Sequence, residues 1–404
     1  MPTSIEALEQ LIKKYGSMAD VAEKIGFSRE TRLKKNGKIA SSTIDSAVMK
    51  LYASDFDGGS VAGTTSASPK PEKKSASGKP LNKGGSSTSG TAKKPTTGTL
   101  KKKLVKPSSS SETVAAKKTV TAEKITPQIK EETQYFKDRF SNSRLFYRKF
   151  LVADANRVMV VVHGVGEHSY RYLNLIKHFT ARQTNMYLMD NRGHGRSEGP
   201  RGHIDAFTQY LDDLYQFLEI VRQTEPGKPV FLLGHSLGGN IVGNYITQRE
   251  QNFAGVILSA PGFAPGFDVP VVKKLLGQLT SQYVPTLALP TGLASSGLSR
   301  DPKVIEDYDN DPLVHDLVSS RFYTEYTRYG QLAVANADMI KCPLLVLQGT
   351  ADSTVSIPQV EKFFNNLTVE DRQIEWFDGF YHECFNDIGK EQVFDILEKW
   401  VNAH

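Results

Sequence analysis

Six short apolar runs alternate with amphipathic stretches from about residue 126 onward, and this alternation restricts the fold more than any other feature of the sequence. The runs are VMVVVHG (158–164), MYLMD (186–190), VFLLG (230–234), AGVILSAP (254–261), PLLVLQG (343–349) and QIEWF (373–377). Strands that are apolar on both faces need cover on both faces, as in a mostly parallel sheet between two layers of helices. We therefore predict an α/β domain over residues 126–404. At the start of this domain, the aromatic stretch 135–153 is interrupted at residues 141–143 by Ser-Asn-Ser and predicts a β-hairpin.

The charge of the chain is unevenly distributed. The 404 residues carry a formal charge of +6, but residues 1–57 hold 9 basic and 8 acidic side chains, residues 58–125 hold 14 and 3, and residues 126–404 hold 27 and 33. Segment 58–125 is rich in Lys, Ser, Thr, Gly and Pro and has too little apolar surface to offset the entropy of folding, so we predict a disordered linker. Its charge of +11 has two interpretations. In the first, the segment binds an anionic polymer or surface, such as nucleic acid, acidic lipid, polyphosphate or a polyester granule. In the second, the segment is a solubilising tether.

We predict a separate small helical domain over residues 1–57, because Ile5, Leu8, Leu11 and later apolar residues recur at helical spacing. Within it, the segment VAEKIGFSRETRLKKNGK weakly resembles the turn of a helix-turn-helix DNA-binding motif. The alternative is a helical bundle with a solvated Lys/Arg face. Whether this unit binds DNA or a protein stays open.

Several protein classes are disfavoured by the sequence. No apolar stretch reaches the ~18 residues of a membrane span, and the N-terminus has no secretory signal pattern. Two cysteines, Cys342 and Cys384, are too few for a disulfide scaffold or a cysteine-rich zinc site. We expect a soluble, cytoplasmic protein without a transmembrane segment, whose basic linker is suited to peripheral contact with a membrane or lipid surface.

The run VFLLG leads directly into Gly234-His235-Ser236-Leu237-Gly238-Gly239, and an amphipathic helix follows. This is a G-x-S-x-G motif in a strand–turn–helix context, which places a serine hydroxyl above the edge of the sheet. Serine needs a base to take its proton, and the base needs an orienting carboxylate. We predict Ser236 as the nucleophile.

The acid and the base are predicted from the ends of the last two strands. Asp352 follows PLLVLQG and His382 follows QIEWF, in the chain order Ser, Asp, His of α/β-hydrolases. The alternatives are a turn-capping aspartate and a surface histidine. Other histidines are less suited as the base: His163, His194 and His203 follow earlier strands, His235 would have to point away from its neighbour Ser236, and His315 lies in an insertion.

The oxyanion of an acyl-transfer reaction needs two backbone donors. We predict the N–H of Leu237, directly after the nucleophile, and the N–H of Val165 in the loop HGVGEHS after the first parallel strand. Flanking glycines allow that loop to turn its amides toward a pocket. The alternative is a plain glycine-rich turn.

Together, HGVGEHSYRY, DNRGHGRSEGPRGHIDAF, GHSLGG, DPLVHD, LLVLQGTAD and the terminal Tyr-His resemble the monoacylglycerol lipase and lysophospholipase branch of the α/β-hydrolases over roughly residues 135–402. The resemblance implies a serine hydrolase with a cap, acting on monoacylglycerols, lysophospholipids or related single-chain esters. It assigns Ser236, Asp352 and His382 to the catalytic triad and Val165 and Leu237 to the oxyanion positions. No metal or organic cofactor is implied.

The residues between AGVILSAP and PLLVLQG predict a helical cap at about 262–338. The stretch 269–299 is rich in Val, Leu, Pro and Gly, which suits an acyl-binding face or, alternatively, ordinary packing of the cap on the body. Cys384, two residues beyond His382, suggests a modifiable thiol near the pocket. The leading hypothesis is a serine carboxylic ester hydrolase. The alternative is a polymer- or surface-binding protein in which residues 1–125 localise the hydrolase domain.

Overall fold

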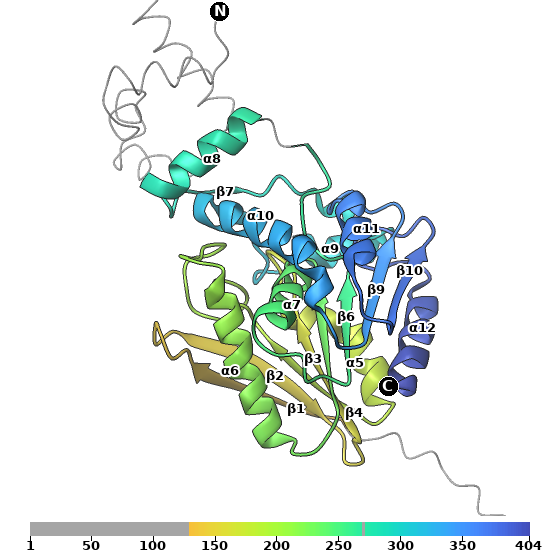
Figure 1. Ribbon diagram of the computed structural model, residues 1–404. Helices are drawn as coiled ribbons and strands as arrows, with labels where there is room; N and C mark the ends of the chain where they lie inside the picture. Colours follow the sequence, from red (N-terminus) through yellow and green to blue (C-terminus); the bar gives the residue numbers. More distant parts are fainter. Residues whose placement is uncertain (1–128, 269–270) are drawn as a thin grey trace, which may run out of the picture. The chain divides into compact units, whose positions relative to one another are not determined.

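The computed structural model describes residues 129–268 and 271–404 (Figure 1), with the side chains of residues 271–276 left out. The predictions for the small helical domain at 1–57, its helix-turn-helix resemblance and the linker at 58–125 lie outside the described residues.

An eight-stranded sheet forms the centre of the described chain. Its strands are β1 (Lys130–Lys137), β2 (Arg144–Leu151), β3 (Arg157–Val162), β4 (Thr184–Met189), β5 (Val230–His235), β6 (Gly255–Ser259), β9 (Leu344–Gly349) and β10 (Arg372–Phe377). The order across the sheet is β1-β2-β4-β3-β5-β6-β9-β10. The pairs β1/β2 and β2/β4 are antiparallel, and every pair from β4 to β10 is parallel. The predicted α/β class with a mostly parallel sheet is confirmed.

Helices cover both faces of the sheet (Figure 1). The helices of the body are α5 (Leu173–Thr180), α6 (Thr208–Thr224), α7 (Leu237–Gln248), α11 (Ile357–Asn366) and α12 (Lys390–Ala403), with a 3-10 turn η1 at Ser169–Tyr172. Alternate residues of β3 enter different cores: Val158 and Val160 pack with the residues of α6 and α7, and Met159 packs with those of α5 and α12. This is why the strands read as continuous apolar runs.

The predicted hairpin is present, but it begins five residues earlier than the aromatic pattern indicated. β1 starts at Lys130 in the polar sequence KEETQ. It lies at the edge of the sheet and is mostly exposed, so apolar periodicity does not mark its first half. The turn is held by the Asp138 carboxylate, which accepts the N–H groups of Phe140 and Ser141 at 3.1 and 2.7 Å.

A long insertion separates β6 from β9. Its elements are α8 (Val271–Tyr283), β7 (Ala288–Pro290), η2 (Ser295–Gly297), α9 (Pro302–Asp309), β8 (Leu317–Ser319), α10 (Ser320–Ala335) and η3 (Ala337–Met339). Two buried asparagines of α7 join α10 to the body, because Asn240 and Asn244 donate from Nδ2 to the carbonyls of Tyr326 and Tyr329. Within the described ranges, none of the helices is both long and apolar enough to cross a bilayer.

Candidate active site

Ser236 lies at the sharp turn between β5 and α7. Its φ of 52° and ψ of −117° are unusual for a residue with a side chain and cost on the order of 1–3 kcal/mol. The turn is held by backbone bonds from Ser236 N to Ser259 O at 3.1 Å and from Gly262 N to Ser236 O at 2.8 Å. Glycine is required beside it, because a Cβ on Gly238 would come within 2.0 Å of the Val162 carbonyl oxygen.

His382 and Asp352 form a buried pair at the ends of the last two strands. Nδ1 of His382 lies 2.8 Å from Oδ2 of Asp352. The same carboxylate accepts Nε2–H of Gln348 at 3.0 Å, and its other oxygen accepts the N–H groups of Thr354 at 2.8 Å and Val355 at 3.2 Å. Four donors therefore fix the carboxylate, and it in turn fixes the imidazole.

The pKa values of this pair are shifted apart. Burial raises the pKa of Asp352, but the His382 charge, their hydrogen bond and the other donors outweigh burial, so the pKa lies below its usual value. Burial lowers the pKa of His382, but the charge and hydrogen bond of Asp352 outweigh it, and the pKa is raised. When His382 is neutral, its contact with the Asp352 carboxylate keeps the ring proton on Nδ1 and leaves Nε2 as an acceptor.

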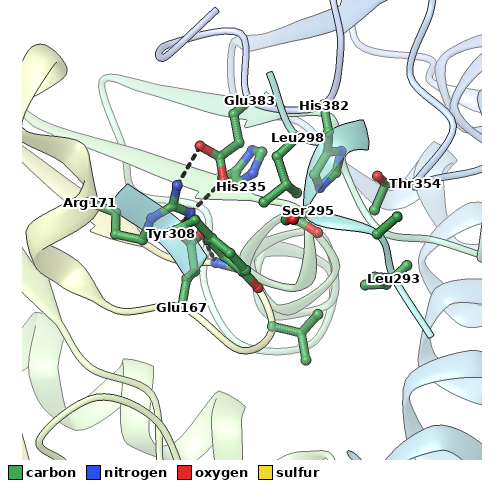
Figure 2. Close-up of a pocket in the computed structure, with 14 residues that line it drawn as sticks. Glu167, Arg171, His235, Leu293, Ser295, Leu298, Tyr308, Thr354, His382 and Glu383 are labelled. Carbon is green, nitrogen blue, oxygen red and sulfur yellow. Dashed lines mark hydrogen bonds and ion pairs between the residues drawn. The ribbon is translucent and has the colours of Figure 1, made fainter. Parts of the chain in front are cut away.

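One pocket brings most of the predicted site residues together (Figure 2). Ser236, His382 and Val165 all line it, while Asp352 is buried and bonded to His382. Leu237 is fully buried at the first position of α7. Among the described residues, the N–H groups of Val165 and Leu237 have no hydrogen-bond acceptor, as expected of groups that would receive an oxyanion.

A buried charge network forms one wall of the pocket, and sequence reasoning missed it. The Arg171 guanidinium lies between the carboxylates of Glu167 and Glu383, with Nη2 to Glu383 Oε2 at 2.9 Å and Nη1 to Glu167 Oε2 at 3.3 Å. Figure 2 shows both contacts as dashed lines. All three side chains are less than 10% exposed, at 9% for Arg171 and 6% for each glutamate. The only local signal was the i, i+4 spacing of Glu167 and Arg171.

Glu167 also holds the loop that carries Val165. Its Oε1 accepts the N–H of Gly164 at 2.6 Å and the hydroxyl of Tyr172 at 2.8 Å. Burial raises the pKa of Glu167, but Arg171 and the neighbouring donors bring it to about 2, so the carboxylate is ionised at neutral pH. The first residues of this loop are therefore held in place by a charged side chain, and the conformation of the loop does not depend on its glycines alone.

The insertion supplies the opposite wall. Leu293, Ala294, Ser295 and Leu298 line the pocket, and Tyr308 from α9 covers Arg171, with the guanidinium carbon 4.6 Å from the ring centroid. The pocket therefore has a charged wall from the body and a largely apolar wall from the insertion.

Three of the other histidines make structural contacts, and of these His163 and His194 are buried while His315 is half-buried. His163, His194 and His315 donate from ring nitrogens to the carbonyls of Gly164, Arg192 and Gly193, and burial lowers the pKa of each. His235 also lines the pocket, with its ring 4.8 Å from that of His382 and its Nδ1 3.1 Å from the carbonyl oxygen of Ser259. Burial lowers its pKa to about 4, with a further contribution from His382.

One sequence interpretation changes. Cys384 is completely buried, and burial raises the pKa of its thiol, so the modifiable thiol expected there was wrong. A further contact joins the insertion to the body, because Asp311 accepts the Leu313 N–H at 2.8 Å and also lies 2.8 Å from Nε2 of His168.

Comparisons with known proteins place this geometry in context. A family model described as serine aminopeptidase, S33 matches residues 153–389. A monoacylglycerol lipase of Mycolicibacterium smegmatis is 29% identical over 252 residues, 62% of this chain and 90% of the relative. Phospholipase YtpA of Bacillus subtilis is 32% identical over 249 residues, 61% of this chain and 95% of the relative. The crystal structure of Paleococcus ferrophilus monoacylglycerol lipase matches with a TM-score of 0.58 and 31% identity, covering 69% of this chain and 99% of that one.

Proposed function

The chain belongs to the serine aminopeptidase S33 family and is a serine hydrolase, and from that premise we propose that it hydrolyses single-chain acyl esters through an acyl-enzyme intermediate. Relatives named monoacylglycerol lipase and phospholipase support an ester hydrolase of this family. The observation that carries the proposal is the meeting of Ser236 and His382 at one pocket, with Asp352 bonded to the far nitrogen of the imidazole.

The proposed mechanism assigns one role to each group. Ser236 Oγ attacks the ester carbonyl while His382 Nε2 takes its proton, and the Val165 and Leu237 N–H groups stabilise the tetrahedral oxyanion. Collapse expels the alcohol, which receives the proton from His382. Water then attacks the acyl-enzyme with His382 as the base, and the fatty acid leaves as Ser236 regains its proton. Asp352 stabilises the imidazolium in both steps.

The two walls of the pocket favour a neutral head group. The guanidinium of Arg171 is shared between two carboxylates, so the formal charges of Glu167, Arg171 and Glu383 sum to one negative charge on this wall. A phosphate placed there would meet uncompensated carboxylate charge, whereas the hydroxyls of a polyol would find acceptors. Leu293, Ala294 and Leu298 offer apolar contact to the acyl chain. We therefore place monoacylglycerols before lysophospholipids as substrates.

A substrate panel with one nucleophile variant tests the proposal. Purified full-length protein is assayed on a short p-nitrophenyl ester, a monoacylglycerol, a lysophosphatidylcholine and an aminoacyl p-nitroanilide. Ser236→Ala should lose at least ~10³-fold in kcat on the esters while keeping its circular dichroism spectrum. Ser281→Ala is the matched control, because Ser281 is buried to a similar degree, at 6% against 7% exposed, and lies outside the pocket. Ester hydrolysis that persists in Ser236→Ala, or faster release from the anilide than from any ester, would contradict the proposal.

A second candidate function attaches to residues 58–125, whose charge of +11 favours contact with a polyanionic surface. In this proposal the segment holds the hydrolase near acidic lipid or another polyanion. Full-length protein should sediment with vesicles containing phosphatidylserine at low salt and be released as salt increases. A variant with the linker lysines changed to glutamine is the control, and equal sedimentation of both proteins would reduce the segment to a spacer.

A further inference from the structure

The loop that carries His382 has no regular structure between the end of β10 and the start of α12, and one buried carboxylate organises it. Asp387 is completely buried and accepts five hydrogen bonds. One comes from the N–H of Tyr381 at 2.8 Å, directly before His382, and another from the N–H of Ile388 at 2.8 Å. Asp387 therefore closes the loop from its far end back to the residue next to the base.

The other three donors to Asp387 come from the insertion. The N–H of Arg300 lies 2.7 Å from Oδ1, Nε of Arg300 lies 3.0 Å from Oδ2, and the Ser299 hydroxyl lies 3.4 Å from Oδ1. The Arg300 guanidinium also donates to the carbonyl of Ile388 and stacks on Phe380, 4.5 Å from the ring centroid. A single side chain of the insertion thus contacts the His382 loop at three points.

The backbone of the insertion runs beside the same loop. Gly297 O accepts the N–H of His382 at 3.4 Å, and Leu298 O accepts the N–H of Glu383 at 2.8 Å. Leu298 also lines the pocket. The segment that forms the apolar wall is therefore bonded to the backbone of the base itself.

We propose that Arg300, acting through Asp387, is a positioning residue that holds the His382 loop in register with Ser236. The inference rests on the proposed function, since it takes His382 as the base. Without the guanidinium, the Oδ2 of Asp387 keeps Tyr381 N–H as its only described donor, and the carbonyl of Ile388 loses the Arg300 contact. The loop is then free to shift at the peptide before His382. A displacement of about 1 Å at a reacting group costs on the order of 10²-fold in rate.

Three variants and two readouts test the role. Arg300→Gln removes the positive charge and the branched set of guanidinium donors, whereas Arg300→Lys keeps the positive charge. Arg222→Gln is the matched control, because Arg222 is equally exposed, at 31%, bonds to Glu250 and lies 5.5 Å from the ring of Phe253, outside the pocket. The readouts are kcat and KM on a p-nitrophenyl ester and the rate at which a fluorophosphonate labels Ser236.

We expect kcat and the labelling rate of Arg300→Gln to fall about 10- to 100-fold, while its KM stays within about threefold of wild type. Arg300→Lys should recover part of both rates, and Arg222→Gln should change neither rate appreciably. Equal kcat and equal labelling in Arg300→Gln and Arg222→Gln, with a lowered melting temperature only, would show that Arg300 is a stabilising ion pair and overturn the proposal. If Arg300→Gln does not fold, Arg300→Lys decides: a wild-type labelling rate in that folded variant also overturns it. Failure of the proposed function is seen separately, as wild-type protein whose Ser236 is neither labelled nor needed for ester hydrolysis.

Discussion

Replacing Asp352 with asparagine removes one charge and inverts one hydrogen-bonding group at the centre of the site. All four groups around this carboxylate are donors: the ring N–H of His382, the amide of Gln348 and the N–H groups of Thr354 and Val355. An asparagine has a single acceptor oxygen, so its NH₂ must face at least one of them. With hydrogen bonds to a charged group worth about 1.5–3 kcal/mol each, we expect the free energy of unfolding to fall by about 2–4 kcal/mol.

The kinetic effect follows from the same geometry. If the new oxygen stays with Thr354 and Val355, the NH₂ faces His382 and forces the ring proton onto Nε2, where it blocks proton transfer from Ser236. The corresponding change in serine proteases lowers kcat about 10⁴-fold, equivalent to about 5.5 kcal/mol in the activation free energy. We expect a loss of that order.

The pH profile gives an independent check with a definite sign. The base must be neutral, so kcat/KM rises with pH through the pKa of His382, which Asp352 raises in the wild type. Without that charge, burial remains and lowers the pKa. The variant should therefore have a lower plateau whose midpoint lies at lower pH.

The assay compares Asp352→Asn with Asp371→Asn, because Asp371 also lies 2.9 Å from a histidine, His404, but is 54% exposed and outside the pocket. Rates on a p-nitrophenyl ester are measured from pH 5 to 9, and stability is measured by urea unfolding. Retention of a tenth of wild-type kcat by Asp352→Asn, or a midpoint displaced to higher pH, would refute the assigned role.

Two further predictions concern stability. Gly238→Ala would place a Cβ 2.0 Å from the Val162 carbonyl oxygen and should prevent soluble expression or lower the melting temperature sharply. Gly277→Ala is the control, because the nearest atom to its added Cβ is a Tyr323 ring atom at 3.7 Å, and it should be neutral or stabilising by up to about 1 kcal/mol. Equal melting temperatures of the two variants would contradict the close packing at the turn that carries Ser236. Arg171→Met leaves Glu167 and Glu383 buried without their cation and should cost about 3–5 kcal/mol in urea unfolding at pH 7. Without Arg171, burial would hold the folded pKa of Glu167 above its unfolded value, so the cost should shrink as pH falls toward 5. A loss that grows on acidification would contradict the network.

The sequence predicted the parts of this fold that local patterns encode. The run VFLLG at 230–234 became β5 at Val230–His235, and Ser236 took the elbow conformation, because a buried strand followed by a glycine-flanked turn and a helix is specified within about twenty residues. Asp352 and His382 were placed at strand ends and are bonded in the structure, although their roles remain a proposal. The start of β1 was missed because an exposed edge strand has no apolar signature.

The missed contacts are those that cross the chain. Arg171 and Glu383 are separated by 212 residues, and Arg300 and Asp387 by 87, so no local period connects them. Each residue alone reads as an ordinary solvated charge. Only the return of the chain to the carboxyl edge of the sheet makes them neighbours, and their burial then makes pairing necessary.

The same long-range contacts restrict how the pocket can open. Among the bonds between the insertion and the body, two sets lie near the pocket. In the first, residues 297–300 meet the His382 loop, and in the second His315 and Ser319 donate their N–H groups to the carbonyls of Gly166 and Gly202 at 2.9 and 2.8 Å. A rigid movement of the whole insertion would have to break both sets of bonds, and breaking the first would disturb the loop that carries the base. A change in access that leaves both sets of bonds intact is restricted to the other parts of the insertion, which include the pocket-lining residues Leu293, Ala294 and Ser295 before Gly297 and Tyr308 in α9. Movement of these residues would change the opening of the pocket while the loop that carries His382 stays in place.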